Sequence, residues 1–322
     1  MNKNIIFLKE TSSYDDILKK EHNKMPLFFK KLVFLYKNTF NIITKKKIED
    51  KEVWVLPVKE KYCISKLEDI IRKGLKCFEN IYLVSNELKE KQAYKIMDKQ
   101  KQEYITEEKI KKILLIHMLE YITNLQNKEI NNLELTILVN STSNLNMYLI
   151  EELAKLSKTL KIVSLNIYKF KKLEEKLYND EGIAIQFSNS YKKSLEKAKI
   201  IINLDFNELE INEYDIFDKA IILNCIDNNI KIKSRLFNGI IINSCDIEYK
   251  KEIINEFKEI KIYENYTRLM LYASSIEKED NIFKVNEKLN EDCLSVISLI
   301  GNSGIINKKE FQNILDKNKK TE

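Results

Sequence analysis

The residues best suited to chemistry in this chain are short polar side chains that directly follow runs of β-branched, apolar residues. Such runs are typical of buried parallel strands, and open parallel sheets bind their ligands outside the carboxyl ends of the strands. Strand ends turn polar in any sheet, so position alone also accounts for these residues. The candidate binding residues selected in this way are Asn140, Ser141, Thr142, Ser143, Asn144, Ser188 and Asp205.

The segment Asn140 to Asn144 follows the first of these apolar runs and bears on nucleotide binding. A dinucleotide-binding fold has G-x-G-x-x-G at this turn, and this segment contains no glycine. Asn166 stands near the end of the next run, where an acidic residue would hold the ribose hydroxyls. Hydroxyl and amide side chains can still cap the following helix, whose free N–H groups can hold one anionic group. The sequence therefore disfavours NAD, FAD or S-adenosylmethionine in the usual mode, leaves a non-standard mode open, and identifies no cofactor.

Other catalytic signatures are missing from the sequence. Neither G-x-x-x-x-G-K-[ST] nor G-x-S-x-G occurs, and the chain has two histidines. His117 falls on the apolar face of a predicted helix and is expected in the core, whereas His22 lies in a charged stretch. The five cysteines form no C-x-x-C pair, which disfavours a structural zinc site, and we expect Cys225 and Cys245 to be buried packing residues. No catalytic set and no metal site is predicted.

The basic residues suggest an alternative function. The net charge is +6, and the excess lies entirely within residues 1–130. Lysines and aromatic residues alternate over 19–47, which is compatible with a platform for single-stranded RNA or DNA, or with a segment on an anionic membrane. A core element with a solvated lysine face is the reading we favour in so lysine-rich a chain. Arginine supplies only Arg72, Arg235 and Arg268, so sequence-specific DNA reading is disfavoured.

The elements that position the candidate residues lie between about 133 and 245. The pattern predicts helices over 145–160, 170–178 and 191–198, and strands over 135–139, 161–165, 183–187, 200–204, 220–223 and 239–242. The strands are apolar throughout, as expected when helices cover both faces of the sheet. We predict an α/β fold with a doubly wound, mostly parallel sheet. It resembles a Rossmann-type module in the order of its elements alone, across roughly a third of the chain.

Three regions are predicted along the chain. Residues 1–130 form a smaller basic α/β domain, with strands at 5–8, 53–56 and 81–84 and helices at 14–20, 64–77 and 107–125. Residues 131–246 form the Rossmann-like domain without G-x-G-x-x-G. Residues 247–322 form a C-terminal segment predicted to be helical over 248–257, 266–276 and 293–300, with a capping box at 307–310.

Three functional hypotheses follow. The first is a cytoplasmic two-domain protein with reduced thiols and no transmembrane segment, which binds a small ligand or a protein partner at its strand-end rim, with or without catalysis. The second is an RNA- or single-stranded-DNA-binding protein that uses the lysine-rich N-terminal region. The third is a group transferase or oxidoreductase with a non-standard nucleotide-binding turn, an idea that rests on fold analogy alone.

Overall fold

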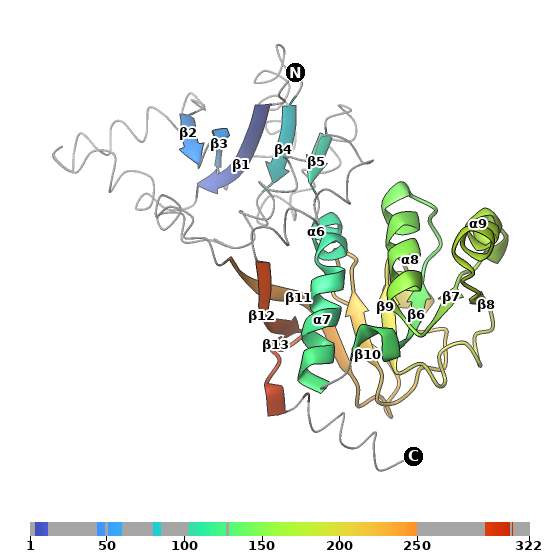
Figure 1. The fold of residues 1–322 in the computed structure, drawn as a ribbon. Coiled ribbons are helices and arrows are strands. Elements are labelled where there is room, and N and C mark those ends of the chain that lie inside the picture. Colours follow the sequence, from blue (N-terminus) through green and yellow to red (C-terminus); the bar gives the residue numbers. More distant parts are fainter. Residues whose placement is uncertain are drawn as a thin grey trace, which may run out of the picture. The chain divides into compact units, whose positions relative to one another are not determined.

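The computed structural model describes residues 4–11, 44–48, 51–59, 80–84, 103–105, 107–126, 129–249, 294–309 and 311, with side chains for 108–126, 129–247, 295–309 and 311. The chain divides into two compact units. The first comprises Met1–Thr106 with Glu252–Ser275, and the second comprises Glu107–Lys251 with Ile276–Glu322. Each unit contains one of the two sheets (Figure 1).

The first unit contains a five-stranded sheet in the order β2-β3-β1-β4-β5. Strands β3, β1, β4 and β5 run parallel, and β2 pairs antiparallel with β3. The strands predicted over 5–8, 53–56 and 81–84 are confirmed, whereas the helices predicted over 14–20 and 64–77 lie outside the described residues, as does most of the 19–47 segment. The bounds are β1 (Asn4–Thr11), β2 (Thr44–Ile48), β3 (Lys51–Lys59), β4 (Asn80–Val84) and β5 (Glu103–Ile105).

The second unit contains an eight-stranded sheet in the order β13-β12-β11-β10-β9-β6-β7-β8. The six strands from β11 to β8 are parallel, β12 is antiparallel to β11, and β13 is antiparallel to β12. The bounds are β6 (Glu134–Leu138), β7 (Thr159–Val163), β8 (Ile185–Ser188), β9 (Ile200–Asn203), β10 (Ile221–Asn224), β11 (Ile240–Tyr249), β12 (Leu294–Gly301) and β13 (Gly304–Ile305).

The parallel strands of this sheet have the classical doubly wound order. Numbered along the chain from β6, the spatial order is 3-2-1-4-5-6, in which the direction of winding reverses between the first and fourth strands. Here these strands are β6 and β9, which pair directly from Leu135 with Ile200 to Leu138 with Asn203. The predicted fold class, a doubly wound and mostly parallel Rossmann-like α/β sheet, is confirmed. The strand order also places the switch point between β6 and β9.

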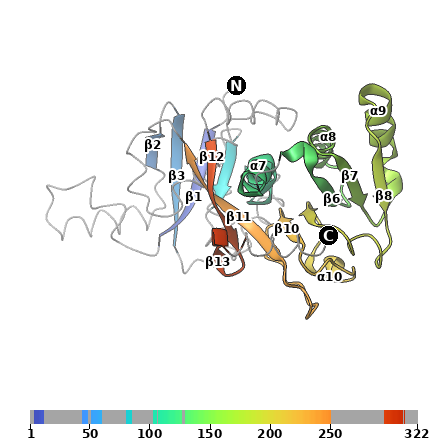
Figure 2. The same cartoon turned by 60° about the horizontal axis from the view of Figure 1, so that its bottom comes forward.

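Helices cover both faces of this sheet. In Figure 2, α7 (Leu115–Gln126) and α8 (Asn144–Leu156) lie on one side and α10 (Glu208–Ile211) lies on the other. Ile137 and Ile202, which are register partners, are fully buried, and so are Ile201 and Ile222 on the opposite face. Two-sided burial is the reason that these strands are apolar throughout.

The remaining helical elements agree with the predictions in part. The helix predicted over 107–125 is observed as α6 (Glu107–Ile113) followed by α7, with the break at Leu114. The helix predicted over 170–178 is α9 (Lys171–Glu181), which ends at Gly182 in the left-handed conformation with φ 69°. Two short 3₁₀ turns, η1 (Ile130–Asn132) and η2 (Ile167–Phe170), precede β6 and α9.

The helix predicted over 191–198 is wrong, because this segment forms a series of turns. Backbone carbonyls that a helix would use internally accept hydrogen bonds from elsewhere in the fold. Tyr191 O accepts from Asp215 N, Leu195 O accepts from Phe217 N, and Ser194 O accepts from Lys161 Nζ at 2.9 Å. Tertiary contacts therefore override a weak local preference for helix in this eight-residue segment.

The helix predicted over 293–300 is also wrong, because these residues belong to β12. Val296, Ile297 and Ile300 are β-branched and fit a pleated strand better than a helix. Val296 and Ile300 pair with β11 in the antiparallel ladder, whereas Ile297 lies at a register shift and its carbonyl accepts from Tyr121 Oη. β11 itself continues to Tyr249, into the start of the helix predicted over 248–257.

The rest of the predicted C-terminal helices lies outside the described residues, apart from the turn at Asn307. There Lys309 N donates to Asn307 Oδ1 and Phe311 N donates to Asn307 O. Among the helices that the structure describes, none combines the length and apolar character needed to cross a membrane.

Candidate functional site

The turn between β6 and α8 is built from side-chain hydrogen bonds. Ser143 is the N-cap of α8, and its Oγ accepts from Asn146 N at 3.3 Å. Ser141 Oγ accepts from Ser143 N, also at 3.3 Å. Hydroxyl groups therefore hold the turn that glycines form in a dinucleotide-binding fold.

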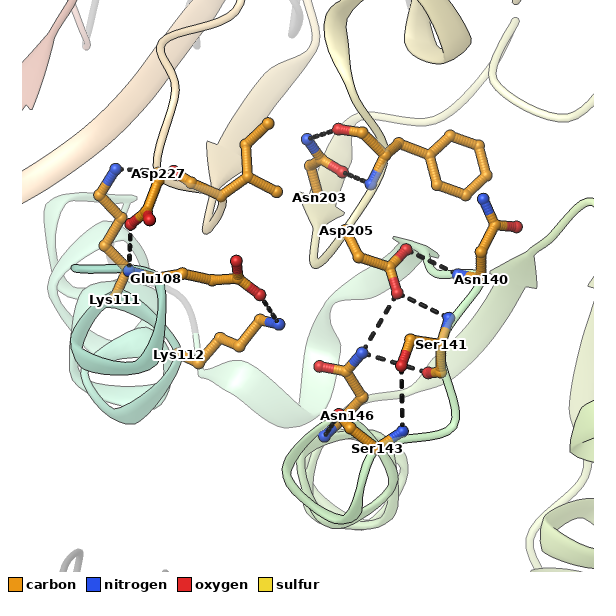
Figure 3. Close-up of polar contacts among 12 residues, drawn as sticks. Glu108, Lys111, Lys112, Asn140, Ser141, Ser143, Asn146, Asn203, Asp205 and Asp227 are labelled. Atoms are coloured by element: carbon orange, nitrogen blue, oxygen red, sulfur yellow. Dashed lines mark hydrogen bonds and ion pairs between the residues drawn. The ribbon is translucent and has the colours of Figure 1, made fainter. Parts of the chain in front are cut away.

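Asp205 follows β9 and places its carboxylate on this turn (Figure 3). Oδ1 accepts from Asn140 N at 2.6 Å, and Oδ2 accepts from Ser141 N at 2.7 Å. Adjacent backbone N–H groups after the first strand are the donors that such folds offer to a ligand's phosphate. In this chain the Asp205 carboxylate occupies these N–H groups. It comes from the end of β9, on the other side of the switch point from β6.

The Asn140 side chain connects the same turn to two other segments. Its Oδ1 accepts from Leu165 N at 2.9 Å and from Ser164 Oγ at 3.3 Å, both of which follow β7. Its Nδ2 lies 3.5 Å from Glu210 Oε1 on α10. The side-chain amide of Asn140 therefore links the turn after β6 to the segment after β7 and to α10.

Asn146, on the first turn of α8, completes the group around Asp205. Its Nδ2 donates to Ser141 O at 3.1 Å and to Asp205 Oδ2 at 3.3 Å. The residue is only 1% exposed, yet its Oδ1 has no hydrogen-bond partner in the structure. An unpaired buried acceptor costs about 1–3 kcal/mol, so this oxygen marks an incomplete polar site.

A second polar group comes from α6 (Figure 3). Lys112, whose side chain is 5% exposed, donates to Glu108 Oε1. Glu108 N donates to Asp227 Oδ1 at 2.7 Å, and Lys111 Nζ donates to Ile226 O at 2.8 Å. Residues 226 and 227 follow β10, so α6 is attached to the same edge of the sheet as Asp205.

The electrostatic environment of Asp205 is mixed. Burial raises the pKa of its carboxyl above the ordinary value, while the hydrogen bonds from Ser141 and Asn140 and the charge of Lys112 act to lower it. Among the described residues, no cation lies within ion-pair distance of this carboxylate. Burial outweighs the contributions that lower the pKa, and the charge of Glu108 also raises it, so the net direction of the shift is upward.

Buried asparagines link the carboxyl ends of β9 and β10 to the neighbouring strand β11. Asn203 Nδ2 donates to Asn224 Oδ1 at 3.0 Å, Asn224 Nδ2 to Asn243 Oδ1 at 2.9 Å, and Asn243 Nδ2 to Asn302 Oδ1 at 2.6 Å. The ladder ends where Asn302 Nδ2 donates to Ile230 O. Asn203 also accepts from Phe206 N and donates to Phe206 O, which fixes the loop that carries Asp205.

The structure brings together four of the seven predicted binding residues, namely Asn140, Ser141, Ser143 and Asp205. Thr142 lies on the same turn and Asn144 is the first residue of α8, and both residues are exposed. Ser188 lies at the end of the edge strand β8, where its hydroxyl bonds to Ser194 Oγ at 2.6 Å. None of its hydrogen bonds reaches Asp205 or the turn.

The described histidine and cysteines lie in the core, as expected. His117 is buried on α7, 3.5 Å from Glu120. Burial raises the pKa of both Cys225 and Cys245 to about 12, so their thiols stay protonated at neutral pH. In the described part of the chain, no group of three or more His, Cys, Asp or Glu residues could hold a metal ion.

Sequence reasoning missed Asn146, Lys112 and the asparagine ladder, and two of these carried a signal. Asn146 occupies a position on the buried face of α8 that continues as Leu149, Ile150 and Leu153, so it interrupts an apolar stripe. The sequence indicates the ladder by placing an asparagine directly after a run of apolar residues in three successive strands, at 203, 224 and 243. Lys112 carried no signal in a chain with so many lysines.

Comparisons with known proteins return only distant likenesses. No protein-family model matches the chain, and no curated protein matches it. Among solved structures, L-tryptophan dehydrogenase from Nostoc punctiforme has 12% identity and a TM-score of 0.32, covering 98% of this chain and 90% of that one. Dipicolinate synthase A chain from Bacillus subtilis has 9% identity and a TM-score of 0.37, covering 89% and 98%. A putative malic enzyme has 12% identity and a TM-score of 0.37, covering 97% and 83%. At these scores the likenesses carry no argument about chemistry, and the fold class follows from the strand order.

Proposed function

We propose that the second unit is a Rossmann-like domain that binds a small polar ligand at the switch point between β6 and β9. The observation that carries the proposal is the unpartnered, buried Oδ1 of Asn146 at the position where this strand order binds ligands. Asp205 and Lys112 provide charged groups of both signs in the same region. A few converging polar groups are characteristic of small-molecule sites.

The position of Asp205 argues against a dinucleotide in the usual mode. A pyrophosphate on Asn140 N and Ser141 N would have to displace the carboxylate that already accepts from both. Two like charges about 4 Å apart repel by about 4 kcal/mol at the effective dielectric near a protein surface. The Asp205 carboxylate would therefore repel a phosphate at this turn, whereas a nucleotide-binding turn presents free N–H donors to it.

Binding, rather than a particular reaction, is the function we propose. The alternatives of a group transferase or an oxidoreductase rest on fold analogy, and one fold serves many unrelated reactions. A cytoplasmic location belongs to the same proposal, supported by two unpaired cysteines in the described core.

A thermal-shift screen tests this function. The compounds are NAD⁺, NADP⁺, FAD, S-adenosylmethionine, sugar nucleotides, amino acids and small amines, each added to the full chain. We expect at least one small polar compound to raise the Tm of the wild type, and the dinucleotides to leave it unchanged. The increase should disappear in Asn146→Ala and persist in Asn131→Ala, since Asn131 is exposed and precedes β6.

Two results would overturn the proposal. One is that no compound raises the Tm of the wild type. The other is that the compounds that do so, dinucleotides included, act equally on wild type and Asn146→Ala.

A further inference from the structure

The orientation of the Asn146 amide is determined by its partners. Nδ2 faces Ser141 O and Asp205 Oδ2, both of which are acceptors. Rotating the amide by half a turn would place Oδ1 against these two oxygens and lose both hydrogen bonds. The atom that remains without a partner is therefore the carbonyl oxygen, and it requires a donor.

The direction of this oxygen is visible in Figure 3, where it points away from Ser141 and toward the side on which Lys112 and Glu108 lie. Lys112 donates to Glu108, so these two opposite charges largely neutralise each other. The α8 N-terminus would favour an anion, but the Asp205 carboxylate already supplies one at this position. What remains beside Asn146 is a negative charge and an unused acceptor.

A donor that also carries positive charge satisfies both of these groups. A primary ammonium group has three N–H donors and no acceptor, so it can supply the donor that Asn146 Oδ1 lacks while its charge offsets that of the nearby Asp205 carboxylate. A hydroxyl offers one donor and no charge, and a phosphate or carboxylate offers neither. Resting on the function proposed above, we propose that this site binds a small ligand through a primary ammonium group that donates to Asn146 Oδ1 and is attracted by the nearby Asp205 carboxylate.

Calorimetric titration of the full chain with ethanolamine, 1,4-diaminobutane and glycine tests the proposal. Tetramethylammonium chloride is the control matched to ethanolamine, because its cation also carries a single positive charge but has no N–H donor. We expect saturable binding of at least one primary amine and none of tetramethylammonium. Asn146→Ala and, separately, Asp205→Asn should each raise the Kd at least about tenfold, because each removes a charge-assisted hydrogen bond or its charge. Asn131→Ala should leave the Kd unchanged.

The two substitutions keep the test decisive if one variant fails to fold. The proposal is overturned if none of the three amines binds, as would happen if a single water fills the position beside Asn146 Oδ1. It is also overturned if tetramethylammonium binds equally well, or if the folded variants bind the amines as the wild type does. A compound without an amine that depends on Asn146 in the thermal-shift screen would uphold the proposed function and refute the amine assignment.

Discussion

At the scale of single residues, Asp205 makes the first turn of this domain different from the glycine-rich turn of a dinucleotide-binding fold. Its two oxygens accept from Asn140 N and Ser141 N, so the protein supplies its own anion at the first turn. The same carboxylate accepts from Asn146, whose other amide atom is left without a partner. One side chain therefore both closes the phosphate position and creates the polar environment next to it.

The raised pKa of Asp205 predicts a pH dependence of stability. Because burial raises this pKa above the ordinary 3.8, the folded chain binds the proton more readily than the unfolded chain. Its stabilising contribution is fully present below the ordinary pKa and is lost as the pH rises through the raised pKa. Asp205→Asn cannot titrate. The free energy of unfolding of wild type minus that of the variant should therefore decrease as the pH rises from about 4, measured by urea denaturation.

The exposed Asp215→Asn variant is the control for removing a carboxylate as such. A wild-type minus Asp205→Asn difference that stays constant or increases over the same pH range would contradict this account of Asp205.

At the scale of elements, the asparagine ladder links the ends of β9 and β10 to β11 at Asn243. Each amide in the middle of the ladder both donates and accepts, so Asn203, Asn224 and Asn243 are buried with their polar groups satisfied. The ladder continues to Asn302, in the turn between β12 and β13, and so ties the antiparallel edge to the parallel strands. The loop carrying Asp205 is anchored to its first member.

Substitution in the middle of the ladder tests its contribution. Asn224→Leu removes the acceptor of Asn203 Nδ2 and the donor to Asn243 Oδ1 and Asn228 O. Since each buried polar group left unpaired costs about 1–3 kcal/mol, we expect the free energy of unfolding to fall by about 3 kcal/mol. Urea denaturation gives this value. The exposed Asn238→Leu variant should change it by less than about 0.5 kcal/mol, and equal losses in the two variants would contradict a special role for the ladder.

At the scale of the whole molecule, two units each have their own sheet, and the candidate site is made entirely from the second. The excess of positive charge lies in residues 1–130, most of which belong to the first unit. The charge is almost wholly lysine, which attracts phosphates without the bidentate geometry that reads bases. The excess of positive charge and the candidate site thus belong largely to different parts of the chain.

This separation predicts how the chain interacts with nucleic acid. Any binding of a single-stranded RNA should weaken at least about tenfold between about 50 and about 200 mM salt, because lysine–phosphate contacts release counterions. It should also be the same in wild type and Asn146→Ala. Fluorescence anisotropy with two oligonucleotides of unrelated sequence measures both effects. Binding that is absent, or that does not weaken with salt, would remove the hypothesis of RNA binding through the lysine-rich region.

The sequence by itself determined the strands of the second unit from 134 to 224, the helices α8 and α9, and the lack of glycine at the first turn. It did not predict the short helix α10, and it extended the helix of α8 into the start of β7. The features that it determined are local properties: buried parallel strands must be apolar on both faces, and a turn either contains glycine or does not. The same locality explains the errors at 191–198 and 293–300. Backbone groups there find partners distant in the sequence, on β7, in the 215–217 segment and on β11.

Only the tertiary structure decided which strand ends meet. Winding reverses between β6 and β9, and this places Asp205 on N–H groups 64 and 65 residues earlier in the chain. Asn146 could be read as a polar interruption of an apolar stripe, but its partners and its unpaired oxygen could not. Hydrogen bonds between distant segments depend on strand order and register, which local patterns do not encode.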